Sequence, residues 1–452
     1  MKKQIIFSVL SLLGLYFFPF LAFSQNDVLN YRPYDQRGIN MFETPKVNAE
    51  GTETGFKVRI GANFAQQFQA LEHENTADSV AISATDPTNA NRLVDLSTGF
   101  NLATANLNID AQLTEGVRVN VVTYLSARHH QEAYVKGGYI QFDEMPFFNS
   151  PTVDKLMDNL TLKIGHYEIN YGDAHYRRSD NGAALYNPFV ENLILDAFNT
   201  EIGAEAVYQN KGLIFVGGIT NGEIKGDVVK IPDLKPEDVD DSSKKSPSWI
   251  GKLGYDKQVN DDLRVRLTGS VYYTGSSKAN NLYGGDRAGS RYYLVLENTK
   301  ASTSANFYSG RFSPRYSDKV FAGMANLFLK YKGVEFFGTY ENANGRLSSE
   351  ADMRNATQLA GELVFRFGKN EQFFVGGRYN TLKAELPKAG NNFGVDNPVQ
   401  IDRIQASAGW FLNKYVLAKF EYVTQEYKDY PSTHIYNGGK FNGFMFEAVV
   451  GF

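Results

Sequence analysis

The sequence predicts an all-β fold: a single antiparallel β-barrel of about sixteen strands that crosses a membrane, with roughly fourteen to eighteen strands compatible with the pattern. Three observations predict this fold class. Apolar residues alternate along many segments, the connections between these segments are alternately short and long, and the chain begins with a secretion signal. We expect the short turns on the periplasmic side and the long loops on the external side.

The carboxyl-terminal segment carries one apolar face. Counting back from Phe452, every second residue is apolar, through Val450, Ala448 and Phe446 to Phe444. The residues between them are smaller and more polar. Side chains of a strand point alternately to opposite faces, so this segment predicts a strand with one face towards an apolar medium. The last strand of a soluble sandwich would look similar, and the amino terminus has to distinguish the two.

The amino terminus has the features of a cleavable secretion signal. Lys2 and Lys3 precede an apolar run over residues 5–23, and Ala22-Phe23-Ser24 reads as a small-x-small cleavage site. The mature chain would then begin near Gln25. A membrane anchor is the alternative, but the run ends at the cleavage site without flanking stop-transfer charges. The secretion signal therefore favours a membrane barrel outside the inner membrane.

The composition agrees with a barrel and excludes several classes of site. Mean hydropathy is −0.35, which suits a wall that shows lipid only every second residue of each strand. The chain holds 27 Tyr and 33 Phe but only 2 Trp, enough aromatic residues for two interfacial girdles. It has 0 Cys, which excludes disulfides, iron–sulfur clusters and thiol catalysis. No segment after the signal is long and apolar enough to cross a bilayer as a helix.

Turn residues mark the ends of the strands. Gly, Asn and Asp, which tolerate the backbone of tight hairpins, occur in short connections such as residues 114–116, 210–212 and 332–333. Long polar stretches lie between these hairpins. The predicted strands are 55–67, 98–113, 117–126, 133–142, 160–169, 200–209, 212–221, 248–257, 262–274, 320–332, 333–342, 356–367, 372–382, 401–412, 415–426 and 439–452.

The phase of each strand predicts which side chains face the lumen. In residues 262–273, Leu263, Val265 and Leu267 share one face, and Arg264 and Arg266 share the other. With a membrane outside, the polar face must line a wet lumen. The predicted lumen faces carry slightly more basic than acidic residues, which favours anions.

One external loop, residues 170–199, is expected to carry the function. It begins with charged residues and continues with an apolar run over residues 185–198. An apolar run would be unfavourable in a loop exposed to water, so this loop should pack against the barrel interior. Its charged residues are Asp173, His175, Arg177, Arg178 and Asp180.

In strand number, loop rank, signal peptide and terminal Phe452, the chain resembles bacterial general-diffusion porins, and most closely the phosphate-selective porin type. The resemblance implies that the third external loop folds inward and narrows the channel. The pore-lining residues would be Asp173, His175, Arg177, Arg178, Asp180, Arg264, Arg266, Arg366, Arg378 and Arg403. The alternative is that the loop residues form local ion pairs that anchor the loop to the wall. The dense lysine ladder of the phosphate-selective type is absent, which favours a general solute pore.

Enzymatic chemistry is not expected. Ser179 lies near His175 and Asp180, but a Gly-x-Ser-x-Gly motif is absent, and a loop is a poor frame for a catalytic triad. A Gly-x-Gly-x-x-Gly motif before a helix is absent too, so no dinucleotide site is indicated. The sequence predicts no catalytic residue, no metal site and no cofactor.

The predicted organisation is a signal peptide at residues 1–24, a short periplasmic extension at residues 25–54 and an outer-membrane barrel at residues 55–452. The extension is too short for the plug domain of an energy-coupled transporter. The predicted function is passive diffusion of small polar solutes, leaning to anions. Expected partners are membrane lipid, lipopolysaccharide, the solutes and further copies in a homotrimer, with no nucleic acid.

Two other functions fit the same barrel. The first is a non-conducting subunit of an outer-membrane secretion or assembly complex, with its lumen sealed by residues 170–199 and by the long loop at residues 275–319. The second is a transporter for hydrophobic ligands, suggested by the apolar run at residues 185–198.

Overall fold

The computed structural model describes residues 30–46, 55–126, 132–223, 246–277, 279–286, 288–387 and 398–452. The predicted signal peptide, residues 1–24, lies outside these ranges. So do residues 25–29 and 47–54 of the predicted extension. Among the described residues, no helix is long and apolar enough to cross a membrane.

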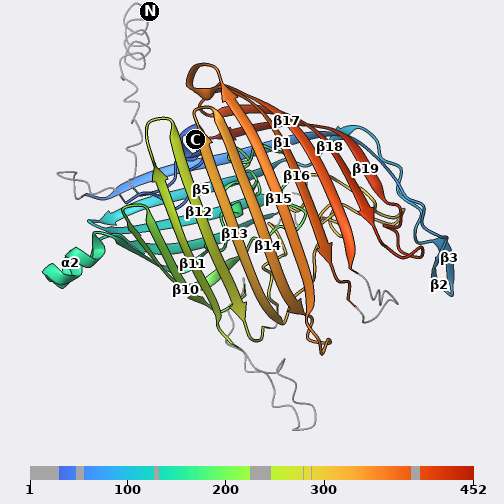
Figure 1. Cartoon of the computed structure of the whole chain (residues 1–452), viewed down its shortest axis with the longest axis horizontal. Coiled ribbons are helices and arrows are strands. Elements are labelled where there is room, and N and C mark those ends of the chain that lie inside the picture. Colours follow the sequence, from blue (N-terminus) through green and yellow to red (C-terminus); the bar gives the residue numbers. More distant parts are fainter. Residues whose placement is uncertain are drawn as a thin grey trace, which may run out of the picture.

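A single antiparallel sheet forms the wall and closes on itself (Figure 1), because β1 pairs with β19 on one side and with β5 on the other. The ring has 16 long strands. They are β1 (Lys57–Glu74), β5 (Thr104–Thr114), β6 (Val117–Ser126), β7 (Glu132–Phe142), β8 (Leu160–Glu168), β9 (Thr200–Asn210), β10 (Leu213–Thr220), β11 (Ser248–Gln258), β12 (Leu263–Thr274), β13 (Lys319–Tyr331), β14 (Val334–Arg346), β15 (Arg354–Phe367), β16 (Phe373–Ala384), β17 (Val399–Asn413), β18 (Val416–Lys428) and β19 (Lys440–Gly451). Each predicted range overlaps one of these strands, and the predicted barrel is confirmed.

The differences from the predicted elements are local. β1 continues to Glu74, past the predicted end at residue 67, because its first half pairs with β5 and its second half with β19. The predicted strand 98–113 is divided into β4 (Gly99–Phe100) and β5, and both pair with β1. A short helix that the sequence did not predict, α2 (Pro151–Met157), lies between β7 and β8, with proline in its first turn.

The remaining short elements lie outside the wall strands. β2 (Ala81–Ser83) and β3 (Asp86–Asn89) form a small two-stranded sheet in the first long loop, and their side chains are largely exposed. The single-turn 3-10 helices are η1 (Gln36–Gly38), η2 (Pro146–Phe148), η3 (Ala174–Tyr176) and η6 (Lys369–Glu371).

The outer face of the wall is apolar and the inner face is polar. Along β12, Leu267 and Val271 are exposed, whereas Arg266, Thr268 and Ser270 are buried. A soluble barrel would show the opposite arrangement, with apolar side chains inside. An apolar outer band around a closed sheet, in which no strand edge is left open, is the arrangement that a lipid bilayer requires. The predicted phase of this strand is confirmed.

Aromatic side chains gather on the outer face near the end with the short turns. The rings of Phe365 and Phe367 stack at 5.4 Å, those of Phe367 and Phe373 at 5.7 Å, and those of Phe373 and Trp410 at 6.1 Å. Amphipathic and aromatic rings favour the boundary between lipid and water. This row matches the aromatic girdle that the composition predicts.

The apolar side chains on the outer face of the wall allow a prediction about stability in a bilayer. Leu253 lies in the middle of β11 and is 64% exposed. Leu253→Arg should therefore lower the unfolding free energy in a bilayer by about 2–4 kcal/mol, because it places a guanidinium near the bilayer midplane. Val259 lies just after β11 and is 52% exposed, so Val259→Arg at the interface should cost about 0–1 kcal/mol. Denaturant titration in lipid vesicles measures both, and equal costs would contradict the assigned depth.

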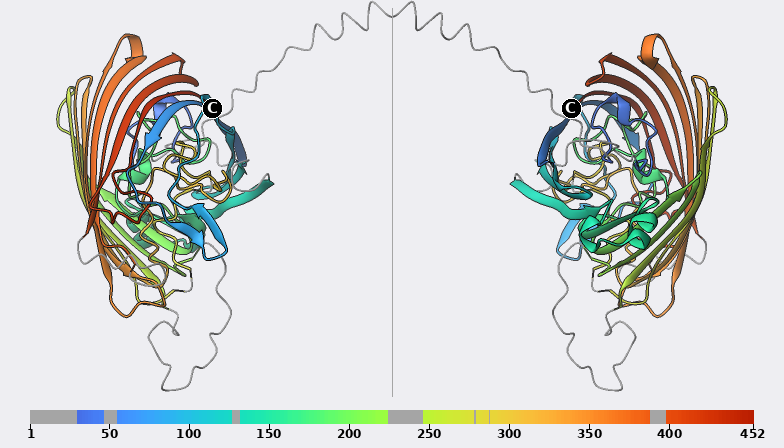
Figure 2. Two further views of the ribbon diagram at one scale, coloured as in Figure 1. Left: turned by 90° about the vertical axis from the view of Figure 1, so that its right-hand side faces the viewer. Right: turned by 90° about the vertical axis from the view of Figure 1, so that its left-hand side faces the viewer.

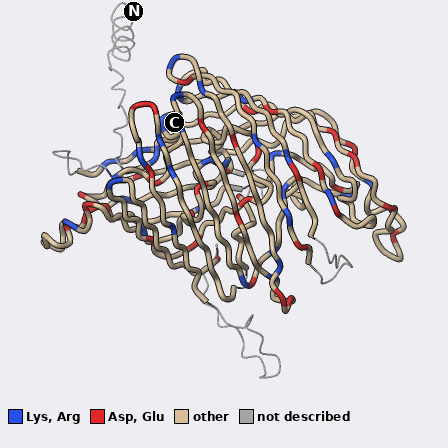
Figure 3. Tube along the Cα trace, viewed as in Figure 1, with Lys and Arg blue, Asp and Glu red and all other residues tan. Residues whose placement is uncertain are grey.

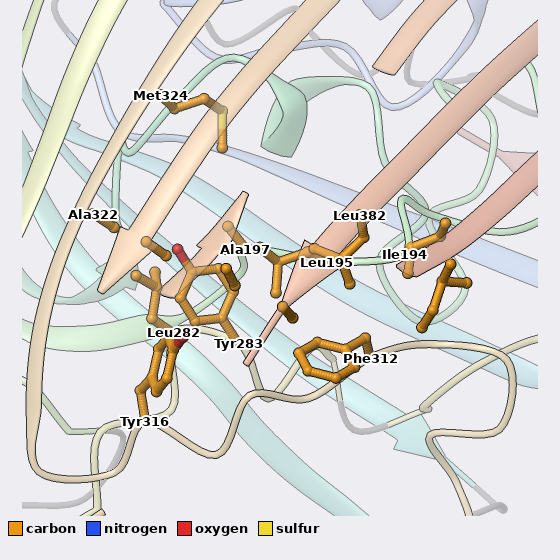
Figure 4. Packing of buried hydrophobic residues seen from close by; sticks show 14 of the residues in the cluster. Ile194, Leu195, Ala197, Leu282, Tyr283, Phe312, Tyr316, Ala322, Met324 and Leu382 are labelled. Carbon is orange, nitrogen blue, oxygen red and sulfur yellow. The ribbon is translucent and has the colours of Figure 1, made fainter. Parts of the chain in front are cut away.

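The barrel interior is filled by two loops, which we call loop 3 (residues 169–199) and loop 5 (residues 275–318). Figure 2 shows both inside the ring of strands. Their apolar residues and those of the inner wall form one buried cluster, shown in part in Figure 4, where Leu195 of loop 3 faces Tyr283 of loop 5. Among the described residues, the centre of the lumen is therefore a packed core without a wide aqueous channel.

The amino-terminal segment, residues 30–46, also lies inside the barrel. Phe42 packs edge-on against Phe328 of β13 with ring centres 5.3 Å apart, and the Lys46 ammonium donates to the carbonyl oxygens of Asp143 and Leu160 at 2.6 and 2.5 Å. The sequence predicts residues 25–54 as an extension into the periplasm. The described part of that segment instead lines the end of the barrel that carries the short turns.

Candidate functional site

Loop 3 is fixed to the wall along its length. The backbone N–H of Ile194 donates to Asn380 at 2.8 Å, and the backbone N–H of Leu195 donates to Gln358 at 2.9 Å. Gly182 lies against the wall backbone so closely that a β-carbon there would be 2.7 Å from the α-carbon of its neighbour in β5. Since wall side chains satisfy loop backbone groups in a buried setting, the loop has one defined position.

Asp173, the first predicted site residue, is fully buried in a cluster of charges. It accepts hydrogen bonds from the Arg266 guanidinium at 2.7 and 2.8 Å and from Thr268 at 2.7 Å. The Lys252 ammonium lies 3.0 Å away, and Glu43 of the amino-terminal segment contacts Arg266 at 2.7 Å. Two cations and two carboxylates therefore neutralise one another, and this cluster connects loop 3, the amino-terminal segment and β12.

His175 and Arg177 are also held by carboxylates. The His175 ring lies with Nδ1 2.9 Å from the carboxylate of Glu168. The Arg177 guanidinium lies 3.6 Å from Glu335 of β14 and 3.3 Å from Glu362 of β15. Burial lowers the pKa of His175 below its usual value, although Glu168 acts in the opposite direction. Burial therefore favours the neutral form of the His175 ring.

Arg178 and Asp180 connect loop 3 to loop 5 and to β7. The Arg178 guanidinium donates to both oxygens of Asp196 at 2.9 and 2.7 Å, and it reaches Asp286 of loop 5 at 3.5 Å. Asp180 accepts a hydrogen bond from the Lys136 ammonium. Burial opposes the charge on Arg178, but Asp196 outweighs it and raises the pKa of the guanidinium above its ordinary value.

The five wall arginines of the predicted site all point inward, as their strand phases predict, and four of them pair with carboxylates. These pairs are Arg264 with Asp256 at 2.7 Å, Arg266 with Asp173 at 2.7 Å, Arg366 with Glu335 at 2.8 Å and Arg378 with Glu362 at 2.8 Å. Arg403 donates to Gln425 at 2.6 Å and to the carbonyl oxygen of Asn192 at 2.7 Å. Arg266, Arg378 and Arg403 therefore hold loop 3 to the wall, whereas Arg264 and Arg366 pair within the wall. The role of the predicted site residues as the lining of a constriction stays a prediction.

The charges of the barrel are interspersed. Figure 3 shows basic and acidic residues alternating along the strands, with no large region of one sign. An excess of lumenal arginine attracts anions only where the arginines lack counter-charges. Since the acids lie beside the bases, the count of lumen-facing residues by itself does not give the selectivity.

Loop 5 supplies part of the charge network that the predicted site does not include. Glu191 of loop 3 is fully buried and accepts hydrogen bonds from Arg311 at 2.8 and 2.9 Å and from Ser290 at 2.7 Å. Asp286 pairs with Arg291 at 3.1 Å. The available signal in the sequence was the presence of Asp and Arg in a loop otherwise rich in Tyr, Ser and Gly. The contacts of Glu191, however, join residues 99 and 120 positions apart.

The charge network should weaken in acid. Burial would raise the pKa of Glu191, but Arg311, Arg291 and Arg403 overcome this and hold it at about 2, against an ordinary value of 4.5. A depressed carboxyl pKa stabilises the folded state above the unfolded pKa, and this contribution is lost as the pH falls from 4.5 towards 2. The lowered pKa of His175 acts in the same direction below about pH 6.5, because the unfolded chain takes up the proton first.

We therefore expect acidification from pH 7 to pH 3 to loosen loops 3 and 5 while the wall stays folded. The Glu191 pair contributes about 2 kcal/mol to this effect, because pH 3 is still above the folded pKa of about 2. Limited proteolysis as a function of pH measures the accessibility of the two loops. Glu191→Gln, which does not titrate, should flatten the part of the profile below pH 4.5. A profile unchanged by this substitution would contradict the assignment.

A cavity of about 280 Å³, lined mostly by polar residues, lies along the inner face of β5–β9, between the wall, loop 3 and the amino-terminal segment. Lys46 and Gln209 line it near the short turns, and Lys136 and Thr200 line it in the half with the long loops. A second cavity of about 710 Å³ lies at the short-turn mouth, lined by Arg264 among others. These two spaces are the candidate path for solutes.

Comparisons with solved structures give matches at low identity and with TM-scores below 0.5. No protein-family model matches the sequence, and no curated protein matches it. The anion-selective porin of Comamonas acidovorans is 9% identical with a TM-score of 0.48, over 88% of this chain and 100% of that chain. The channel DcaP of Acinetobacter baumannii is 10% identical with a TM-score of 0.48, over 89% of this chain and 99% of that chain. OmpT, an outer-membrane protein of Vibrio cholerae, is 10% identical with a TM-score of 0.47, over 89% of this chain and 99% of that chain.

These values assign neither a solute nor a partner to this chain. The barrel is established by its own strand pairing, and the proposed function rests on the interior described above.

Proposed function

We propose that the chain is an outer-membrane channel for the passive diffusion of small polar solutes, with a narrow path along the inner face of β5–β9. The observation that carries the proposal is the 280 Å³ cavity, which is lined mostly by polar residues from both halves of a wall whose outer face is apolar. The predicted signal peptide at residues 1–24 would deliver the chain across the inner membrane.

The filled lumen limits what can pass. At about 30 Å³ per water molecule, a cavity of 280 Å³ holds roughly nine waters. Such a path admits one small hydrated solute at a time. It is lined by asparagine amides and tyrosine hydroxyls, including Asn63, Asn108, Asn120 and Tyr139. Amides and phenols replace the hydration of a polar solute without holding it tightly.

The anion preference stays part of the proposal. In the predicted constriction, carboxylates neutralise Arg177 and Arg178. Any preference for anions must therefore come from a cation that the protein itself does not neutralise. Membership of the phosphate-selective porin type and assembly as a homotrimer also stay predictions, and the mass of the detergent-solubilised complex tests the trimer.

Single-channel recording in planar bilayers tests the proposal. We expect discrete, small openings, and liposome swelling should admit monosaccharides but exclude trisaccharides. Mature protein that conducts no ions and admits no sugar would overturn the proposal.

That negative result would favour the second candidate, a sealed barrel that serves as a subunit of an outer-membrane complex. Its support is the extent of the buried network between loops 3 and 5, such as the Arg311–Glu191 pair at 2.8 Å. Purification from native membranes distinguishes the two, because a sealed subunit should copurify with unrelated chains. The hydrophobic-ligand alternative has less support, since Val190, Ile194 and Leu195 of the apolar run are buried against protein.

A further inference from the structure

Arg32 differs from the other arginines inside the barrel. Its Nε donates to the carbonyl oxygen of Gly38 at 2.8 Å, and its guanidinium lies over the ring of Tyr186, 3.6 Å from the ring centre. Its Nη2 atom is buried and has no hydrogen-bond partner. Among the described residues, no carboxylate lies within ion-pair distance of it. Arg403 also lacks a carboxylate, but its N–H groups reach Gln425 and backbone carbonyl oxygens.

The electrostatic balance around Arg32 is correspondingly unfavourable. Burial lowers the pKa of Arg32, whereas the carboxylates beside Arg178 and Arg291 raise theirs. The carboxylate of Glu168 acts on Arg32 from farther away, but it is bonded to Lys136 at 3.2 Å. A buried cation without a counter-charge destabilises a protein unless something else supplies the negative charge.

Further polar atoms without partners line the same cavity. They are the hydroxyls of Tyr31 and Tyr167 and the side-chain nitrogen of Asn63, all buried. The amide nitrogen donates, and each hydroxyl can donate or accept. Buried polar groups without protein partners indicate that water or a ligand completes them. One cation and three polar groups on one cavity therefore form an incomplete binding site.

We propose that this cavity binds a small hydroxylated carboxylate, such as a sugar acid, with its carboxylate on the Arg32 guanidinium and its hydroxyls on Tyr31, Tyr167 and Asn63. The planar guanidinium matches a carboxylate with two parallel hydrogen bonds. The cavity of about 280 Å³ lies just below the usual range of roughly 300–1,000 Å³ for ligand pockets, which suits a ligand of six or so carbons. The inference rests on the proposed function, since the site lies on the proposed path.

Calorimetry on the mature protein in detergent tests the site without requiring conduction. The probes are gluconate, glucose and glucosamine, which are similar in size and differ in charge. Gluconate should bind at least tenfold more tightly than glucose, and glucosamine should not bind. Inorganic phosphate should bind more weakly than gluconate, because it cannot reach the hydroxyls and the amide together. Tighter binding of phosphate would overturn the assigned ligand class.

Arg32→Gln should weaken gluconate binding by about 10- to 100-fold, the usual effect of losing a charge-assisted hydrogen bond. Arg32→Lys should give an intermediate loss, because it keeps the charge without the planar fork. Arg37→Gln is the matched control, since Arg37 lies in the same segment, pairs with Asp35 and does not line the cavity. Equal gluconate affinity in wild type and Arg32→Gln would overturn the assigned contact with the guanidinium, and a wild type that binds no gluconate would mean that the cavity holds water only.

A second pair of variants does not depend on the charge. Tyr167→Phe removes a hydroxyl that has no protein partner, so it should leave the melting temperature unchanged but weaken gluconate binding by about 3- to 10-fold. Tyr316→Phe removes a hydroxyl of the same kind in loop 5, outside the cavity, and should change neither. Unchanged binding in Tyr167→Phe would contradict the hydroxyl contact.

The two proposals fail in distinguishable ways. Gluconate binding without any current would leave the site standing and overturn the channel. Current without gluconate binding would leave the channel standing and overturn the site. Where both hold, Arg32→Gln should also lower the anion-to-cation permeability ratio measured from reversal potentials in a salt gradient.

Discussion

Glu191→Ala is expected to release loop 5 from loop 3 and to raise the single-channel conductance several-fold. The Glu191 carboxylate is fully buried and holds Arg311, Ser290 and the backbone of Arg291. Removing one partner of a buried ion pair costs about 3–5 kcal/mol, because the remaining charge is left without compensation. The wall strands keep their hydrogen bonds, so the loss of stability affects the loops and not the wall. Bilayer recording together with limited proteolysis of loop 5 measures the effect.

A matched control is available at the short-turn mouth. Glu371 pairs with Lys330 at 2.8 Å, but its side chain is 40% exposed. Glu371→Ala should therefore change stability by about 0–1 kcal/mol and leave loop 5 protected. If Glu191→Ala kept wild-type conductance and wild-type protection, the lumen would not be closed by the network described here.

Removing residues 30–46 is expected to widen the short-turn mouth and to raise the conductance. The segment fills this end of the lumen with Phe42 and supplies Glu43, which lies 3.1 Å from Lys252 and 2.7 Å from Arg266. Without Glu43, Lys252 and Arg266 keep only Asp173 and Asp256, and Asp256 is shared with Arg264, so the local charge becomes positive. The deletion also removes Arg32, so the effect of this local charge on selectivity is measured with Glu43→Gln. A secretion signal fused directly to residue 47 gives the variant, and conductance and reversal potential give the readout.

Two further variants separate the effect of the volume of residues 30–46 from the effect of their charge. Glu43→Gln keeps the segment and removes its charge, so it should shift the reversal potential with little change in conductance. Deletion of residues 80–89 removes the small exposed sheet of β2 and β3 and should change neither property. A deletion of residues 30–46 that conducts like the wild type would mean that the segment does not limit the path.

Much of the wall could be predicted from the sequence because the signal is local. The alternation that ends at Phe452 follows the two-residue repeat of a β-strand, which can be recognised from neighbouring residues alone. The strand predicted at residues 439–452 corresponds to β19 (Lys440–Gly451). Gly, Asn and Asp in the short connections predicted the ends of the hairpins in the same way. β1 was predicted too short because its last residues pair with β19, a contact between the two ends of the chain.

The candidate site could be predicted only in part. Loop 3 was expected inside the barrel because an apolar run in a water-exposed loop is unfavourable, and it does lie there. Its charged residues were expected either to line a constriction or to form ion pairs that anchor the loop. Arg177 pairs with Glu362 and Arg178 with Asp196, and their role as the lining of a constriction stays a prediction. Arg32 gave no sequence signal, since the absence of a counter-charge is visible only once all neighbours are in place.

The sequence by itself determined that this protein is a membrane barrel, which way its strands run and which side chains face inward. These properties follow from the alternation of side chains and from turn chemistry, both of which operate between residues close in the chain. Only the tertiary structure decided what fills the lumen and which charges remain available. Ion pairing inside the barrel joins residues from loop 3, loop 5, the amino-terminal segment and distant strands, and a low-dielectric interior makes each charge depend on partners that sequence distance does not reveal.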